Sequence, residues 1–255
     1  MSSFASYPSL KDRAVFISGG GSGIGASIVE HFAGQGAKVA FVDIDEAASK
    51  ALGAKISAAG HTAPMFAKCD VRDIAAYQAA IAEMANRLGP FTVLVNNAAR
   101  DDRHTIEDVT PAFWDERIAV NLRHQYFAIQ SVAPGMKKAG GGSIVNFSSV
   151  SYHAMAPELS VYEAAKAAVV GMTRGLARDL GPDNIRLNIV TPGWIMTQRQ
   201  IDLWLTPEAE VDLMKAQCLK EKLYPPDLAR MVLWLASDDS RLVTAQNFVV
   251  DGGRM

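Results

Sequence analysis

A chain of 255 residues is long enough for one large domain or two small ones. Hydrophobic residues make up 49% of it, enough for a sizeable core, and the 20% share of charged residues excludes an intrinsically disordered chain. The formal net charge of -2 gives no electrostatic reason to expect nucleic acid or an anionic membrane surface as a partner.

The cysteines, histidines and first residues point to an ordinary soluble protein. Cys69 and Cys218 lie far apart, and the histidines form no cluster with metal-ligand spacing, so no metal is expected. Residues 1–10 lack the basic start and apolar run of a secretory signal, and no run approaches the ~18 apolar residues of a membrane span. We therefore expect a cytoplasmic protein of a reducing compartment.

Short β-rich runs alternate with longer stretches of helical periodicity. Strands are predicted at residues 14–17, 38–43, 64–68, 92–96, 143–147, 186–190 and 247–250. Helices are predicted at residues 24–35, 73–88, 112–138 and 160–180, with a further one that ends near residue 59. Continuous apolar runs suit strands covered on both faces, and the alternation requires parallel pairing with right-handed crossovers. The expected fold is α/β, with a doubly wound, mostly parallel seven-stranded sheet and helices on both faces.

A glycine-rich turn follows the first predicted strand and runs directly into a helix. Its glycines allow positive φ and let the backbone approach a pyrophosphate at the helix N-terminus. The letters fit two registers, G-x-G-x-x-A at Gly21, Gly23 and Ala26 or G-x-x-x-G-x-G at Gly19, Gly23 and Gly25. A purely structural turn is the alternative, but the order strand, turn, helix favours a bound dinucleotide.

Asp43 ends the second strand, where an acid accepts hydrogen bonds from the adenosine ribose. Its carboxylate repels a 2′-phosphate, and neither Ser22 nor Ile44 supplies a compensating positive charge, which favours NAD over NADP. The alternative role, a helix N-cap or turn aspartate, fits Asp45 better. Asp70, at the end of the third strand, is a candidate for the adenine amino group, with capping of the next helix as an equal alternative.

Tyr162 and Lys166 lie one turn apart on the same face of a predicted helix. A phenol titrates near ~10 in water, and a neighbouring ammonium lowers that pKa toward the working range. The spacing alone occurs by chance in many helices. Here the glycine-rich turn, Asp43 and the hydroxyls of Ser148 and Ser149 accompany it. Together they predict a site for nicotinamide-dependent oxidation of an alcohol.

Residues 194–226, here called the lid segment, lack a strand signal and contain Pro207, Pro225 and Pro226. A long insertion after a strand, on the side where ligands bind, is a candidate substrate lid. An equal alternative is a helical excursion that packs at a subunit surface.

With these segments placed, the chain resembles the short-chain dehydrogenase/reductase family over almost its whole length. The matching pieces are residues 18–25, 96–99, Asn121, Ser149, residues 162–166 and residues 192–193. Ser18 stands where the family often has threonine and Ala99 where it usually has glycine. The resemblance implies a single Rossmann-fold domain over residues 1–255 and a homotetramer, in which the helices before and after the Ser149 strand pair across a two-fold axis.

The resemblance implies a role for each catalytic residue. Tyr162 is the general base, and Lys166 lowers its pKa and binds the nicotinamide ribose. Ser149 holds the reacting oxygen, with Ser148 as the competing register. Asn121 carries a water of a proton relay; alternatively it is a polar helix residue satisfied by backbone. The cofactor contacts, besides Tyr162 and Lys166, are Gly19, Ser22, Gly23, Ile24, Gly25, Asp43, Asp70, Val71, Asn97, Ala98, Pro192, Gly193, Ile195 and Thr197.

Within the family, polar strings at residues 100–104, 108–110, 114–117, 120–124 and 218–220 resemble those of bacterial aldose 1-dehydrogenases for xylose- or arabinose-type sugars. That subgroup oxidises the anomeric carbon of the cyclic sugar to a lactone. A sugar needs several hydrogen-bonding groups around the reacting carbon. The candidate contacts are Asp102, Arg103, Ser149, Ser151, His153, Tyr162 and Trp194. The alternative for Asp102 and Arg103 is that they pair with each other on a loop.

Three other functions compete with sugar oxidation. A reductase of a small ketone or of a carrier-bound 3-oxoacyl group is favoured by a basic rim, but the basic residues of the lid segment are interleaved with acids. A non-catalytic NAD-binding sensor requires a decayed catalytic set, and this set is complete. A Rossmann-fold methyltransferase leaves Tyr162 and Lys166 unexplained.

Overall fold

The computed structural model describes residues 4–255 and contains one seven-stranded sheet in the order β3-β2-β1-β4-β5-β6-β7. Its strands are β1 (Ala14–Ser18), β2 (Lys38–Asp43), β3 (Met65–Lys68), β4 (Val93–Asn96), β5 (Gly142–Phe147), β6 (Ile185–Pro192) and β7 (Asn247–Val250). Every neighbouring pair is parallel. The expected α/β class is therefore confirmed, and the sheet is parallel throughout.

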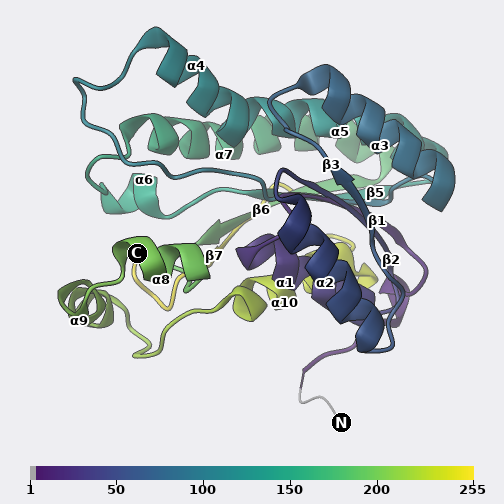
Figure 1. The fold of residues 1–255 in the computed structure, drawn as a ribbon. Helices are drawn as coiled ribbons and strands as arrows, with labels where there is room; N and C mark the ends of the chain where they lie inside the picture. Colours follow the sequence, from purple (N-terminus) through teal and green to yellow (C-terminus); the bar gives the residue numbers. More distant parts are fainter. Residues whose placement is uncertain (1–3) are drawn as a thin grey trace.

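Helices cover both faces of this sheet (Figure 1). They are α1 (Gly23–Gly34), α2 (Glu46–Ala58), α3 (Ile74–Leu88), α4 (Pro111–Ile118), α5 (His124–Lys138), α6 (Ser151–Ala154), α7 (Ser160–Leu180), α8 (Gln198–Trp204), α9 (Pro207–Ala216) and α10 (Pro225–Ala236). In Figure 1, α3, α4, α5 and α7 lie on one side of the sheet, and α1, α2 and α10 on the other. Within residues 4–255, no helix combines the length and apolar character needed to cross a membrane.

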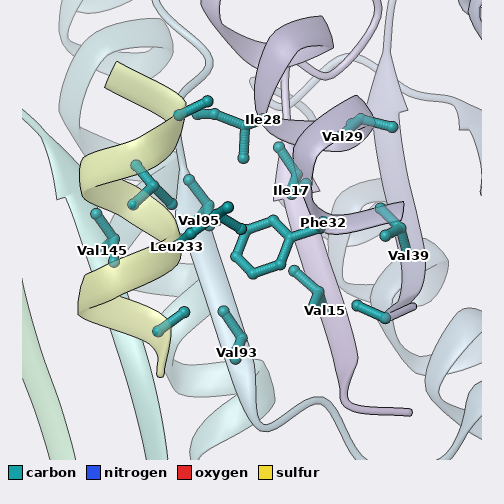
Figure 2. Packing of buried hydrophobic residues seen from close by; sticks show 14 of the residues in the cluster. Val15, Ile17, Ile28, Val29, Phe32, Val39, Val93, Val95, Val145 and Leu233 are labelled. Atoms are coloured by element: carbon teal, nitrogen blue, oxygen red, sulfur yellow. The ribbon is translucent and has the colours of Figure 1, made fainter. Parts of the chain in front are cut away.

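Alternation along the strands divides the core into two apolar layers. Side chains of successive strand residues point to opposite faces, so Val15 and Ile17 join one cluster and Phe16 the other. Phe32 of α1 packs against the first layer, beside Val15 and Leu233 (Figure 2). Burying a side chain of this size contributes about 1.5–3 kcal/mol. Because helices pack on both faces of the sheet, the ends of the strands have fixed positions.

The carboxyl ends of the strands meet at one edge of the sheet. Ser18 pairs with Asn96 in register, and Asn96 with Asn146. The strand order reverses between β1 and β4, and ligands of open α/β sheets bind in the crevice at such a reversal. The loops that follow these strands carry the predicted site residues.

The helix predicted at residues 112–138 is not one regular helix. A π-helical turn over Ala119–Arg123 separates α4 from α5. Within this turn the Asn121 side chain donates to Arg117 O of the preceding helix, at 3.0 Å, and to Arg100 O, at 3.1 Å. Single π turns are frequent at functional sites. The apolar pattern continues through the turn, so periodicity alone could not reveal it.

Helix α10 lies where no helix was predicted. Its first residues, Pro225 and Pro226, are the last two of the lid segment. Proline is favourable in the first turn of a helix, because its missing N–H would have no intrahelical partner there. The N–H of the N-cap residue Tyr224 donates to the Asp227 carboxylate at 2.8 Å, and this hydrogen bond caps the N-terminus of α10.

Candidate active site

The turn between β1 and α1 has the backbone of an anion cradle. Gly19 and Gly23 adopt φ of +68° and +53°, which favour glycine. A Cβ on Gly25 would lie 1.8 Å from Gly19 O, so no side chain fits there. The N-cap residue Ser22 makes no side-chain cap hydrogen bond, which leaves the first N–H groups of α1 for a ligand. The residues present therefore fit the pyrophosphate of a dinucleotide.

Side chains at the end of β1 and just after β4 hold this turn in place. Asn97 Nδ2 donates to Gly19 O at 2.9 Å and to Ser18 O at 3.2 Å. The Ser18 hydroxyl accepts from the N–H groups of Asn97 and Ala98 at 3.1 and 3.2 Å. Serine thus supplies the hydroxyl that threonine would supply. Asn97 and Ala98, for which cofactor contact is predicted, lie beside the glycine turn.

Asp43 faces the same turn from the end of β2. Its Oδ2 accepts from the Gly21 N–H at 2.8 Å, and its Oδ1 from the Asp45 N–H at 2.9 Å. Each oxygen keeps acceptor capacity for a ribose hydroxyl. Asp45 is the N-cap of α2 and accepts from the Ala48 N–H, so the capping role falls to Asp45 and not to Asp43.

Asp70 does not cap the next helix. Asp73 is the N-cap of α3 and accepts from the Ala76 N–H at 3.0 Å. Asp70 pairs with Arg72, and this hydrogen bonding lowers the pKa of the Asp70 carboxyl. Val71, between them, is buried.

Ser149 follows β5, and Tyr162 and Lys166 lie on α7. Lys166 is 1% exposed; its Nζ donates to Phe147 O at 3.0 Å and lies 5.5 Å from the centroid of the Tyr162 ring. The buried Ser148 hydroxyl donates to Lys166 O at 2.7 Å, so Ser148 ties β5 to α7. Ser149, and not Ser148, is the serine that acts on Tyr162, where it opposes the burial that raises the pKa of the phenol.

Burial controls the ionisation of both α7 residues. It lowers the pKa of Lys166 to about 7, against the opposing charge of Asp101. It raises the pKa of Tyr162 above its ordinary value; Asp101 acts in the same direction, and the hydrogen bond with Ser149 opposes it. The protein alone therefore does not lower the pKa of Tyr162 as the sequence predicted. Further positive charge in the pocket is needed for that.

Asn121 holds the loop after β4. Its Oδ1 accepts from the Arg100 N–H at 2.9 Å, and its Nδ2 donates to the carbonyls of Arg100 and Arg117. The side chain is thus satisfied by backbone, while the Asn121 carbonyl accepts from Gln125 Nε2 at 3.2 Å. The interpretation as a backbone-satisfied polar residue describes this side chain.

Asp102 and Arg103 do not pair with each other. Asp102 forms ion pairs with Arg100, Arg117 and Arg199. Arg103 instead donates to the carbonyl of residue 157 at 3.1 Å and lies 4.8 Å above the ring of residue 204 in α8. Both residues therefore join the loop after β4 to other parts of the site.

The remaining predicted sugar contacts lie at different depths. Ser151 is buried, and its N–H donates to Ser149 Oγ at 3.2 Å, next to the reacting position. His153 is exposed and stacks on Tyr152 with ring centroids 4.0 Å apart. The indole N–H of Trp194 donates to an amide oxygen on α8 at 2.9 Å.

The segment after β6 returns to the glycine turn. A Cβ on Gly23 would lie 3.2 Å from Thr197 Cγ2, so Thr197 borders the cradle. A Cβ on Gly193, which follows Pro192, would lie 2.7 Å from the Cα of residue 251, so this chain crossing is also tight. Ile195 is buried and bridges to residue 223. The predicted cofactor residues of this segment thus adjoin the cradle or the strand end.

Sequence reasoning missed Asp101 and Gln200. Asp101 Oδ2 accepts from Gln200 Nε2 at 2.6 Å, across 99 residues of sequence. It also missed His104, whose Nε2 accepts from the Val161 N–H at 3.2 Å and so caps the start of α7. The sequence around Asp101 and Asp102 does not show that their roles differ, because the residues that they contact are distant in the sequence.

Comparison with known proteins gives a consistent result. A family model described as enoyl-(acyl carrier protein) reductase matches residues 19–254. A probable galactose dehydrogenase of Rhizobium meliloti is 52% identical over 247 residues, 97% of this chain and 96% of that protein. A D-xylose 1-dehydrogenase of Caulobacter vibrioides is 51% identical over 251 residues, 98% of this chain and 99% of that protein.

Solved structures show the same fold with either nicotinamide cofactor. A 3-oxoacyl-[acyl-carrier protein] reductase with bound NAD from Brucella melitensis has a TM-score of 0.88 and 33% identity, covering 98% of this chain and 94% of that one. A blue fluorescent protein from a metagenomic library, in complex with NADPH, has a TM-score of 0.87 and 34% identity, covering 96% and 99%.

Proposed function

The chain belongs to the short-chain dehydrogenase/reductase family of oxidoreductases, and from this premise we propose that it oxidises a free aldose at the anomeric carbon to a lactone, with NAD as cofactor. The observation that carries the sugar substrate is near-full-length similarity, at 51% and 52% identity, to proteins described as sugar dehydrogenases. A pentose or a 6-deoxyhexose is the first choice.

The chemistry rests on Tyr162, Ser149 and Lys166. Tyr162 takes the proton of the anomeric hydroxyl, and Ser149 holds that oxygen by a hydrogen bond. Bound oxidised NAD would supply the acceptor for the hydride of the anomeric carbon and would add positive charge to the pocket. Such a charge favours the phenolate and opposes the burial that raises the pKa of Tyr162. Lys166 lies close enough to act on Tyr162 in the same sense while it is protonated.

The cofactor would lie between the glycine turn and α7. The first N–H groups of α1 would bind its pyrophosphate, and Asp43 its adenosine ribose. The choice of NAD over NADP rests on Asp43, whose carboxylate repels a 2′-phosphate. Lys166 would bind the nicotinamide ribose. Because the Asn121 side chain is satisfied by backbone groups, its main-chain carbonyl, which accepts from Gln125 Nε2 and has a second lone pair, would carry the water of a proton relay.

Reduction of a carrier-bound 3-oxoacyl group is the second candidate, because the matching family model and the Brucella structure are described as carrier-protein reductases. An acidic carrier would need a free basic rim. In the lid segment, Lys215 pairs with Asp212 and Lys222 with Glu210. These pairs reduce the positive charge of the rim and favour the free sugar.

The test is a panel of pentoses, hexoses and simple ketones, each with NAD and NADP, followed by the absorbance of the reduced nicotinamide. We expect turnover with a pentose or 6-deoxyhexose and NAD. Tyr162→Phe should reduce turnover by at least about 10²-fold and leave NAD binding nearly intact. Turnover with a hydrophobic ketone and no aldose contradicts the sugar substrate, and a preference for NADP contradicts the role of Asp43.

A further inference from the structure

Asp102 is a structural counter-ion. Its carboxylate is shared among Arg100, Arg117 and Arg199. The side chain of Arg117 is only 7% exposed, and a buried guanidinium needs paired carboxylates. Arg117 forms one ion pair with Asp102 and a second with Glu116. The three arginines occupy the oxygens of Asp102 and leave it poorly placed to bind a substrate.

The neighbouring Asp101 has a different environment. Its Oδ2 accepts one short hydrogen bond, from Gln200 Nε2 at 2.6 Å, and its Oδ1 forms an ion pair with Arg199 Nε at 3.4 Å. Its side chain is 22% exposed.

Asp101 lies in the loop after β4, and Gln200 links it to Trp194 after β6. His104 of the same loop contacts the start of α7, the helix that carries Tyr162 and Lys166. The negative charge of Asp101 also raises the pKa of both Tyr162 and Lys166. Asp101 is thus a carboxylate beside the reacting position with acceptor capacity left over.

Gln200 fixes the orientation of Asp101 from α8. The Gln200 amide uses both ends: Oε1 accepts from Trp194 Nε1 at 2.9 Å, while Nε2 donates to Asp101. The start of α8 is capped by Thr197, which borders the glycine turn. The lid segment therefore reaches the loop after β4 through this amide.

We propose that Asp101 is a specificity residue that accepts a hydrogen bond from a ring hydroxyl of the sugar, and that Gln200 is the residue that positions it. The inference rests on the proposed sugar substrate and names the carboxylate that recognises it. A ligand that lacks the hydroxyl binds more weakly, because it removes water from the partly buried carboxylate without replacing the lost hydrogen bond. This loss of binding free energy is larger than the loss that a missing group causes at an apolar surface. Asp102, the carboxylate predicted from the sequence, is assigned to loop structure instead.

The test compares the parent with Asp101→Asn on the best aldose, on its monodeoxy analogues and on cyclohexanol. Loss of a charge-assisted hydrogen bond should raise the KM for the aldose about 10- to 100-fold. The KM for NAD should stay within about twofold. One deoxy analogue lacks the hydroxyl that Asp101 contacts. For this analogue the KM of Asp101→Asn should be nearly equal to the KM of the parent, because neither protein can make the hydrogen bond. A purely structural role would affect all the sugars alike.

The matched control is Asp183→Asn, because Asp183 precedes the amino end of β6, at the edge of the sheet away from the site, and its side chain is 36% exposed. It should leave every KM unchanged. Gln200→Ala serves as the second variant in case Asp101→Asn does not fold, and it should raise the KM for the aldose several-fold.

Three results overturn the inference, and they are distinguishable. If the parent oxidises aldoses but Asp101→Asn, or Gln200→Ala in its place, leaves every KM within twofold, Asp101 does not contact the sugar and the proposed function stands. If the parent oxidises no aldose, the proposed function fails and the inference with it. Equal losses for the aldose and all its deoxy analogues also overturn the inference.

Discussion

Lys166 places an ionisable amine where water hardly reaches it. It is 1% exposed, and one contact of its Nζ is the Phe147 carbonyl at 3.0 Å. Removing an ammonium from water is costly unless it is paired, and this burial lowers the pKa of Lys166 to about 7. Lys166 therefore lowers the stability of the fold at neutral pH, which is a cost of having an amine in the active site.

Replacing Lys166 should stabilise the cofactor-free protein. Between the folded pKa of about 7 and an unfolded pKa near ~10.4, the unfolded chain binds more protons, so the parent gains stability as pH rises. The cost of Lys166 is greatest at and below pH ~7. At pH ~7 the free energy of unfolding of Lys166→Met should thus exceed that of the parent by on the order of a few kcal/mol, so the variant unfolds at a higher urea concentration. As the pH rises above ~7, this difference should shrink by about 1.4 kcal/mol per pH unit.

Urea titrations of parent and Lys166→Met at neutral and alkaline pH, without cofactor, measure this difference. The variant should be inactive at both. A variant less stable than the parent at neutral pH contradicts the burial cost assigned to Lys166.

Residue identities in the catalytic set could be predicted because their signals are local. Tyr162 and Lys166 are four residues apart, and the glycine turn lies between one strand and one helix. Asp101 and Asp102 are adjacent in sequence, yet one contacts Gln200 and the other is surrounded by arginines. Those partners lie up to 99 residues away, and no local pattern contains them.

At the scale of elements, the strands were predicted closely because apolar runs buried on both faces have clear ends. The π turn and helix α10 were not predicted. The π turn at Ala119–Arg123 depends on bonds to the loop after β4, and the start of α10 depends on prolines that favour a first helical turn. Both are set by contacts or positions that periodicity does not record.

The π turn leads to a prediction about Asn121. Its side chain satisfies the N–H and carbonyl of Arg100 and a carbonyl of α4. Asn121→Ala leaves these groups unpaired and should cost about 1–3 kcal/mol of unfolding free energy. Turnover should also fall, because the loop that carries Asp101 loses its anchor.

Urea unfolding and hydrogen exchange at the Arg100 amide check this prediction. The control is Ser131→Ala on α5, because the Ser131 hydroxyl donates only to Phe127 O within its own helix, at 2.8 Å. Equal effects of the two substitutions on Arg100 exchange would show that Asn121 does not anchor the loop.

At the scale of the molecule, the long helices α5 and α7 form part of one outer layer (Figure 1). Ile129, Val132 and Val169 are buried within the chain and serve its own core. Phe127 and Val170 are only half-buried, as is Met172. The apolar residues of these helices therefore divide between a core and a partly open face.

We predict that two such faces pair across a two-fold axis and that the protein is a homotetramer. Light scattering at micromolar concentration should give a mass near four times the 27.4 kDa of the chain. Val170→Asp places a charge on the face and should reduce the mass, because an unpaired buried charge is costly. Ile44→Asp, at an isoleucine after β2 that is 59% exposed, is the matched control and should leave the mass unchanged. A monomeric parent refutes the prediction, and a tetramer unaffected by Val170→Asp places the interface on another face.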